Sequence, residues 1–339
     1  MERWVVSRLS SQRGVALLIV LLIVALVTVL ATEMGARLQL NIQRTVNLKD
    51  NNQAYWYAMG AESLARRSLY TLMQDTGDKI ALNQPWAQAF SYPVENGVIQ
   101  ARLEDMQSCF NLNALQPDTA NARSAGSGSS GINVSASMTA FHQLLLAAEL
   151  ELSSYDADTL RDSLADWLDD DSQMRSYGAE DSTYESKSPA YLAANRLMSS
   201  QSELRLINGV SPKWLNALLP LVCVIPQSNT LSVNVNTLTP ERAAVLAGIT
   251  GLSLPAAQNL IDARPPDGWD NSSDFLAEPA ISAIELSDEQ KSWFSVTTEY
   301  FILHSKTRYN NARFTMTSVL KVASDSPVTV VRREFAGVN

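Results

Sequence analysis

Carboxylate side chains crowd into one short stretch, DWLDDDSQMRSYGAEDSTYES, and their spacing suggests cation binding. Six of them lie within 16 residues: Asp166, Asp169, Asp170, Asp171, Glu180 and Asp181. Such a group repels itself unless a positive charge lies among its members. Calcium takes about six to eight oxygen ligands from flexible loops and needs neither thiolate nor imidazole. The EF-hand spacing is absent, so the stretch is either an irregular calcium site or a solvated acidic helix end.

Residue types that commonly carry catalysis are few and isolated. The chain has two histidines, His142 in an apolar helical stretch and His304 in a strand-like stretch, and both suit packed or surface positions. No H-E-x-x-H, G-x-S-x-G or Walker motif occurs. The two cysteines, Cys109 and Cys223, could form a disulfide in an oxidising compartment or remain buried thiols. The sequence therefore predicts a protein that is not an enzyme.

One segment resembles a nucleic-acid-binding module. VNVNTLTPERAAVLAGITGLSLPAAQNLIDARPPDGW is similar to the helix-hairpin-helix repeats of DNA-binding competence proteins in its first residues and in its G-I-T-G turn. That hairpin offers backbone N–H groups to phosphate and relies on nearby Lys or Arg. The helix expected over residues 255–263 has neither, and Arg242 and Arg264 at its margins stand beside acidic residues. Because the net charge is −9, we expect a packing module and no nucleic-acid partner.

The N-terminal segment has the pattern of a long helix, and the rest of the chain follows from its end. A short basic head precedes an apolar run over residues 15–31 in which only Thr28 is polar. This run reaches the lower limit of the about 17–25 residues that span a bilayer. Apolar residues then recur at helical spacing, at Met34, Leu38, Ile42 and Val46. The pattern predicts one helix over residues 15–72, about 85 Å long, whose first part is a signal peptide, a plain anchor or a retained stem.

The rest of the chain alternates between strand and helix patterns. An Asn96-Gly97 turn precedes an alternating stretch over residues 98–104, which is typical of a strand. A Gly/Ser linker follows at residues 124–131, and helical patterns, one of them over residues 193–207, continue to about residue 294. Strand patterns return on both sides of Asn310-Asn311. The order predicts an α+β fold in which a helical domain interrupts an antiparallel sheet.

The basic head, the glycine, the apolar run and the amphipathic continuation together resemble the N-terminus of type IV pilins and type II secretion pseudopilins. The resemblance implies cleavage by the prepilin peptidase between Gly14 and Val15, with N-methylation of Val15. Only the head would be lost, and because it carries three Arg against one Glu the net charge would change from −9 to −11. Pilins usually have Glu at the fifth mature position, where Ile19 stands here.

That departure, the long chain and the interrupted strand order resemble the K-type minor pseudopilin of the general secretion pathway. The resemblance implies a type IV pilin-like fold with a long N-terminal helix packed on an antiparallel sheet and a large all-α inserted domain. The expected segments are a prepilin leader (1–14), a transmembrane part of the stem (15–31), the rest of the stem with the first strands (32–111), the inserted helical domain (112–295) and the remaining strands (296–339).

In this family a segment of the form D-W-x-D…G-A-E-D…Y…A-N-R is associated with bound calcium, and DWLDD, GAED and AANR stand in that order here. The resemblance therefore favours Ca²⁺ as a cofactor. The ligands that we predict are Asp169, Asp171, Glu180 and Asp181, with Asp170 as a further candidate.

The resemblance implies a structural role at the tip of the pseudopilus, where the subunit would initiate or cap assembly for protein export from the periplasm. Its partners would be the I- and J-type minor pseudopilins, the major pseudopilin, the prepilin peptidase and exported proteins. The chain would cross the inner membrane once, with its C-terminal part in the periplasm. The alternative is a membrane-anchored periplasmic binding module, which would keep an unprocessed Met1.

Overall fold

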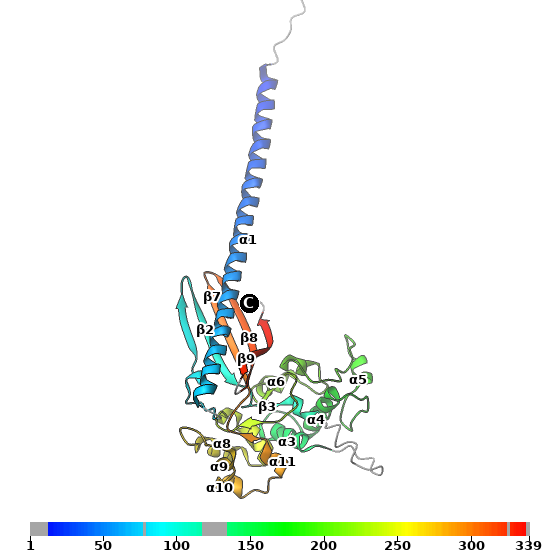
Figure 1. Cartoon of the computed structure of the whole chain (residues 1–339). Helices are drawn as coiled ribbons and strands as arrows, with labels where there is room; N and C mark the ends of the chain where they lie inside the picture. The colour runs from blue at the N-terminus through cyan, green and yellow to red at the C-terminus, as the bar shows by residue number, and fades with distance from the viewer. Residues whose placement is uncertain (1–12, 77–78, 117–133, 324–325, 337–339) are drawn as a thin grey trace, which may run out of the picture.

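In the computed structural model, which describes residues 13–76, 79–116, 134–323 and 326–336, a single long helix dominates the shape (Figure 1). Helix α1 covers Arg13–Thr76, 64 residues or about 96 Å. Residues 1–12 of the predicted leader (1–14) lie outside the described residues, and so does the Gly/Ser segment 124–131. Every side chain from Val15 to Lys49 is exposed, and the apolar start of α1 is long enough to cross a membrane.

The second half of α1 packs on a sheet through one narrow face. Its buried residues recur every three or four positions, so they form a single stripe along the helix. The stripe consists of Asp50, Ala54, Ala58, Ala61, Glu62, Ala65 and Leu69. Most of these side chains are alanines, which let the helix axis approach the strands closely.

The sheet has five antiparallel strands in the order β1-β2-β7-β8-β9. The strands are β1 (Phe90–Val94), β2 (Gly97–Asp105), β7 (Tyr300–Tyr309), β8 (Ala312–Ala323) and β9 (Ser326–Ala336). The hairpin predicted at Asn96-Gly97 is present: Asn96 has a φ of 59°, and a Cβ on Gly97 would lie 2.0 Å from the carbonyl oxygen of Arg308. Asn310, with a φ of 48°, turns the second predicted hairpin.

An ion pair joins α1 to the last strand. Buried Glu62 accepts two hydrogen bonds from Arg333 of β9, at 2.7 and 2.6 Å, and a third from Ser318 of β8 at 2.7 Å. Burial raises the pKa of Glu62, but the bonds from Arg333 and Ser318 outweigh that effect and hold the pKa below its ordinary value. The pair fixes β9 against the stem.

Strands β2 and β7 are neighbours in the sheet, and Asp105 lies opposite Phe301. The end of β2 at Asp105 and the start of β7 at Tyr300 are nevertheless almost two hundred residues apart in sequence. The intervening chain forms the inserted region, at the end of the molecule away from the start of α1 (Figure 1). Its helices are α3 (Ala136–Ala147), α4 (Ser154–Leu168), α5 (Asp181–Glu185), α6 (Pro212–Leu218), α7 (Ala243–Thr250), α8 (Leu254–Asp262), α9 (Ser272–Leu276), α10 (Pro279–Ser282) and α11 (Asp288–Ser292). Short 3-10 helices cover Pro85–Ala87 (η1), Leu112–Leu115 (η2), Gln201–Leu206 (η3) and Pro240–Arg242 (η4).

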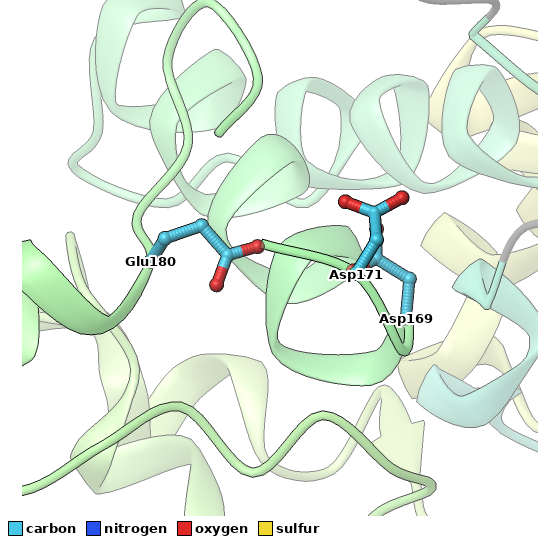
Figure 2. Close-up of side chains that lie close together, drawn as sticks. All are labelled: Asp169, Asp171 and Glu180. Carbon is cyan, nitrogen blue, oxygen red and sulfur yellow. The ribbon is translucent and has the colours of Figure 1, made fainter. Parts of the chain in front are cut away.

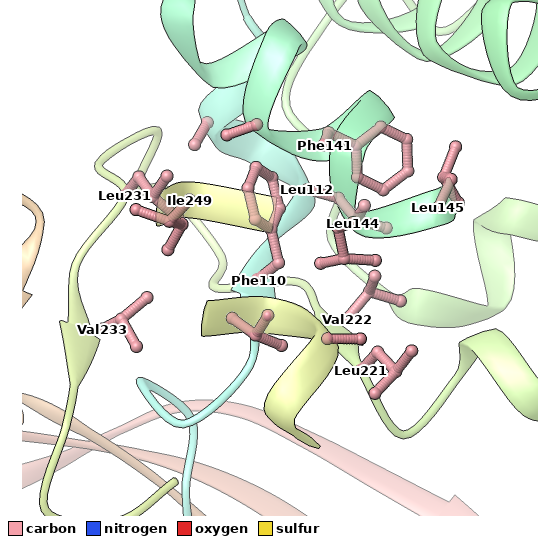
Figure 3. Close-up of a cluster of buried hydrophobic side chains, with 14 of the residues drawn as sticks. Phe110, Leu112, Phe141, Leu144, Leu145, Leu221, Val222, Leu231, Val233 and Ile249 are labelled. Carbon is pink, nitrogen blue, oxygen red and sulfur yellow. The ribbon is translucent and has the colours of Figure 1, made fainter. Parts of the chain in front are cut away.

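The predicted fold class is confirmed, but the inserted region is not purely helical. Strand β3 (Phe110–Asn111) pairs in parallel with β4 (Val222–Cys223), and β5 (Val233–Asn234) pairs in parallel with β6 (Phe294–Ser295). Residues 110–111, which the sequence placed with the pilin strands, therefore belong with the inserted region. Its core surrounds Phe110 and Phe141, whose ring centroids are 5.5 Å apart (Figure 3).

The inserted region contains an internal repeat that the sequence analysis did not recognise. N-L-N-A-L at residues 111–115 and N-V-N-T-L at residues 234–238 each begin at the last residue of a short parallel strand. In each, the second asparagine makes two hydrogen bonds to the backbone of one distant residue. Asn113 bonds Met198 at 2.8 and 3.0 Å, and Asn236 bonds Trp269 at 2.8 and 2.9 Å. The inserted region therefore consists of two similar modules that follow one another along the chain. The first module contains residues 111–115 and the second contains residues 234–238.

Candidate metal centre

The acidic stretch is held by the end of α4 and the start of α5. Helix α4 begins with a capping box between Ser153 and Asp156. It ends at Leu168, where Asp169 leaves helical geometry as the C-cap. Trp167 packs edge-on against Tyr184 of α5, with ring centroids 5.2 Å apart. This contact closes the loop of residues 169–180 against the core.

Three of the predicted ligands meet in this loop (Figure 2). Asp169, Asp171 and Glu180 each offer a carboxylate oxygen, and these oxygens lie within 4.8 Å of one another. Asp169 and Glu180 are buried, whereas Asp171 is exposed. The group thus opens to solvent on the side of Asp171, which gives a dissolved ion a way in.

Several carboxylate oxygens in this group lack hydrogen-bond donors, although Asp169 Oδ2 accepts from Arg175 and Asp171 Oδ1 accepts from the Gln173 backbone N–H. Among the described residues, Asp169 Oδ1 and both Glu180 carboxylate oxygens are buried without a hydrogen-bond partner. Asn195 Oδ1 is also buried and unpartnered, while its Nδ2 donates to the Asp171 carbonyl oxygen at 3.4 Å. Buried polar oxygens without partners are costly. Because hard oxygen atoms are the ligands that Ca²⁺ prefers, the residues present fit this ion.

The two buried carboxyl groups have strongly shifted acidities. Burial raises the pKa of Asp169 to about 6, against the opposing effect of Arg175. Burial, and then the negative charges of Asp166, Asp169 and Asp171, raise the pKa of Glu180 to about 7. Both shifts express the same fact, which is an excess of negative charge in a partly desolvated space.

Asp166 organises the loop without facing the group of three. Its side chain is fully buried, and Oδ2 accepts hydrogen bonds from the backbone N–H of Arg175 (3.2 Å) and Ala179 (3.0 Å). A Cβ on Gly178 would lie 1.9 Å from this oxygen. Glycine is therefore required at residue 178 because the loop backbone must pass directly over the Asp166 carboxylate.

Two predicted ligands do not join the group. Asp170 points into solvent because α4 has already ended and the chain leaves the core there. Asp181 begins α5, and its Oδ1 accepts a hydrogen bond from the Ala193 backbone at 3.0 Å. Asn195, whose amide lies beside Asp171, was not among the predicted ligands, although it lies in the A-A-N-R segment that supported the prediction.

The helix predicted over residues 193–207 is wrong over most of its length. Asn195 has a φ of 46°, in the left-handed region, and only Gln201–Leu206 forms a 3-10 turn. Asparagine tolerates this conformation better than most residues. The turn places the Asn195 amide beside Asp171, a tertiary arrangement that the local apolar pattern does not reveal.

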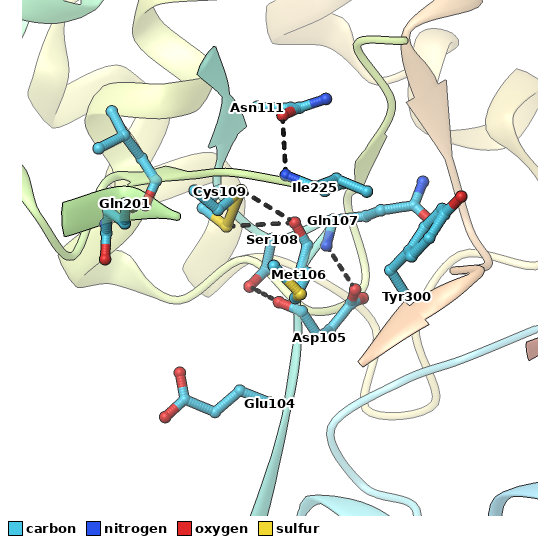
Figure 4. The surroundings of a disulfide bond; sticks show 12 residues. Glu104, Asp105, Met106, Gln107, Ser108, Cys109, Asn111, Gln201, Ile225 and Tyr300 are labelled. Carbon is cyan, nitrogen blue, oxygen red and sulfur yellow. Dashed lines mark hydrogen bonds between the residues drawn. A yellow bond between two sulfur atoms is a disulfide. The ribbon is translucent and has the colours of Figure 1, made fainter. Parts of the chain in front are cut away.

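A disulfide lies where the inserted region meets the sheet (Figure 4). Cys109 and Cys223 are bonded, with Cα atoms 5.8 Å apart, and both sulfur atoms lie 3.1 Å from the Met106 carbonyl oxygen. Beside them, fully buried Asp105 accepts hydrogen bonds from Gln107 N (2.7 Å), Asn234 Nδ2 (3.0 Å) and Thr237 Oγ1 (2.7 Å). The end of β2 is thus fixed to both modules.

The segment that resembles a DNA-binding hairpin has its arginines directed inward. Arg264 donates to the carbonyl oxygens of Val235 (3.1 Å) and Leu238 (2.7 Å). Arg242 bonds Ser108 and lies 3.2 Å from Glu104. Arg264 therefore holds its own segment together, and Arg242 joins that segment to the residues at the end of β2.

The remaining candidate residues lie far from the acidic loop or have ordinary partners. Val15 and Ile19 are exposed on α1, and Gly14 lies within that helix. His142 lies 3.2 Å from Asp158, and His304 lies 3.6 Å from Glu104.

Comparisons with known proteins match this architecture. Two family models, both described as type II secretion system protein K, match residues 108–227 and 233–297, which correspond to the two modules. Type II secretion system protein K of Aeromonas hydrophila is 37% identical over 96% of this chain and 98% of its own length. The Klebsiella pneumoniae protein of that name is 38% identical over 95% of this chain and 96% of its own length.

A solved structure is similar over most of the chain. It is the crystal structure of the GspK-GspI-GspJ complex from the type 2 secretion system of enterotoxigenic Escherichia coli. The matching chain gives a TM-score of 0.75 at 28% identity and covers 87% of this chain and 99% of that one. The similarity therefore includes the fold of the inserted region as well as the sheet.

Proposed function

This chain belongs to the type II secretion system protein K family, so it is a minor pseudopilin, and we propose that it occupies the tip of the pseudopilus. The observation that carries the proposal is Ile19 in the apolar, exposed start of α1. A carboxylate at this position would pair with the N-terminal amine of a neighbouring subunit, and here none is available. At the tip no subunit lies beyond, so no such pair is needed.

The shape of the molecule supports the same position. The inserted region lies at the end of the molecule away from the start of α1, where it would project from a filament without blocking the stem (Figure 1). In the middle of a filament, a body of this size would have to fit between neighbouring subunits. At the tip it initiates or caps assembly without that constraint.

The proposed partners follow from the solved complex, in which the similar chain is assembled with GspI and GspJ. We place this subunit beside the corresponding I- and J-type pseudopilins, above the major pseudopilin, with exported proteins as possible contacts of the inserted region. The exposed apolar start of α1 lies in the inner membrane before assembly. Packing against partner stems then replaces lipid contacts at little hydrophobic cost. The globular part lies in the periplasm.

Processing of the N-terminus tests the proposal. We expect protein isolated from secreting cells to begin at N-methylated Val15, because the prepilin peptidase cuts after Gly14. Intact mass measurement and sequencing of the N-terminal peptide provide the readout. Gly14→Val should retain Met1 and abolish secretion. Wild-type protein that retains Met1 would instead favour a simple membrane-anchored binding module.

We further propose that the acidic loop binds Ca²⁺, held by Asp169, Asp171 and Glu180, with Asn195 as an additional oxygen ligand. The unpartnered oxygens of Asp169, Glu180 and Asn195, and the convergence of Asp169, Asp171 and Glu180, support the proposal. The bound ion would neutralise the crowded carboxylates and fix the loop. Its role is structural, and no catalytic step is proposed for it.

Chelation tests the calcium proposal. We expect EGTA to lower the melting temperature of the full chain in detergent by about 5 °C, because a ligand at about 100 times its Kd stabilises the folded state by about 2.7 kcal/mol. The loop should also become sensitive to protease. Glu180→Gln should lose this calcium response, whereas Asp170→Asn, whose side chain is exposed outside the group, should keep it. Equal melting with EGTA and with excess calcium would contradict the proposal.

A further inference from the structure

Arg175 is a buried cation inside the acidic loop. Only 8% of the residue is exposed. Its Nη1 donates to Asp166 Oδ1 and, at 2.6 Å, to Asp169 Oδ2. Its Nε has no hydrogen-bond partner among the described residues. A single guanidinium nitrogen thus serves two carboxylates, and the arginine is not saturated with partners.

Asp169 connects this arginine to the group of three carboxylates. One of its oxygens, Oδ2, accepts from Arg175, while the other, Oδ1, is buried and unpartnered. Oxygens of Asp169, Asp171 and Glu180 lie within 4.8 Å of one another. The Asp169 side chain is therefore positioned from one side, and its second oxygen is left for a ligand on the other side.

Charge explains why an arginine is needed here. Asp166, Asp169 and Glu180 are buried, with Asp171 and Asp181 close by, and Arg175 is the cation that bonds two of the buried acids. Removing one partner of a buried ion pair leaves an uncompensated charge, which is strongly destabilising. A guanidinium suits this position because it remains charged when buried and keeps its donors in a fixed plane.

We infer that Arg175 is the resident counter-ion of the calcium site: it holds Asp166 and Asp169 in place when no metal is bound, and it shares Asp169 with the ion when metal binds. This inference rests on the proposed calcium site. Arg175 is a positioning residue, since it contacts a ligand and not the ion. Because Arg175 and the divalent ion neutralise the same carboxylates, each reduces the stabilisation that the other provides.

The test compares Arg175→Met, Arg175→Lys and wild type as full chains in detergent, each in EGTA and in millimolar calcium chloride. Methionine keeps much of the side-chain volume without charge, and lysine restores the charge without the planar fork. Arg205→Met, at an exposed arginine on η3, is the matched control. The readouts are melting temperature and hydrogen exchange of the peptide covering residues 166–181.

In EGTA we expect Arg175→Met to melt about 5–10 °C below wild type, with Arg175→Lys between them and Arg205→Met unchanged. Calcium should then raise the melting temperature of Arg175→Met at least twice as much as that of wild type, and restore protection of the 166–181 peptide. A purely structural arginine would give equal calcium gains in both proteins.

The outcomes separate this inference from the proposed function. Equal calcium gains in wild type and Arg175→Met, or a smaller gain in the variant, would overturn the inference and leave the calcium site standing. A variant that melts like wild type in EGTA would also overturn it. If the melting temperature of wild type does not respond to calcium, the proposed calcium site is overturned. The inference that Arg175 shares Asp169 with the ion then falls as well.

Discussion

Replacing Cys109 and Cys223 together by serine is expected to lower the free energy of unfolding by about 4–5 kcal/mol. The two cysteines are 114 residues apart, so the bridge removes many conformations from the unfolded chain. In this region it joins the segment after β2 to β4 and thereby closes the first module. The measurement is equilibrium unfolding in urea under oxidising conditions.

Reductant supplies the control for this prediction. Dithiothreitol should destabilise wild type by about the same amount and leave the double serine variant unchanged. A loss below about 1 kcal/mol in the variant would show that the unfolded chain remains compact around this loop without the bridge. Serine is a suitable replacement because it is close in size to cysteine.

Asp105→Ala is the second substitution with a large expected effect, about 3–4 kcal/mol. The fully buried carboxylate accepts from Gln107 N, Asn234 Nδ2 and Thr237 Oγ1. Each buried donor left without an acceptor costs about 1–3 kcal/mol. Because Asn234 also donates to the Ile80 carbonyl oxygen at 3.1 Å, the loss should loosen the contact between the second module and the sheet. Hydrogen exchange of β2 and β5 would locate the change.

Asp105→Asn and Asp270→Ala are the matched controls. Asparagine keeps one acceptor in place and should cost less than alanine, while replacing exposed Asp270, which pairs with Lys79, should cost about 0–1 kcal/mol. Burial raises the pKa of Asp105, against the hydrogen bonds from Thr237 and its neighbours. The contribution of Asp105 to the free energy of unfolding therefore declines as pH rises through that raised pKa. Asp105→Asn should lack this pH dependence. Wild-type stability in Asp105→Ala would contradict the proposed junction.

Features with a local physical cause were predictable from the sequence. The stem helix follows from apolar residues at helical spacing with no proline before Pro85. The two hairpins follow from Asn96-Gly97 and Asn310, since asparagine tolerates a positive φ. The family was recognisable from the N-terminal stretch and from GAED with AANR. These patterns involve residues that are close in sequence, so they can be recognised without knowledge of the fold.

Other features depend on contacts between distant residues. The pairing of β2 with β7 and the parallel pairs β3–β4 and β5–β6 join segments whose sequences do not indicate that they pair with each other. The Asn113 and Asn236 bonds to Met198 and Trp269 were likewise invisible, although the N-x-N-x-L pattern repeats. Helical propensity over residues 193–207 was overridden by the turn at Asn195.

The acidic stretch shows most clearly which features the sequence determines and which depend on the tertiary structure. By itself the sequence determined that six carboxylates crowd into 16 residues and that a divalent cation is a chemically suitable partner. The tertiary structure decided that Asp169, Asp171 and Glu180 converge, that Asp170 and Asp181 turn elsewhere and that Arg175 is bonded to two of the acids. The reason is physical: composition fixes the total charge of a loop, whereas the end of α4 and the Gly178 turn fix the direction of each side chain.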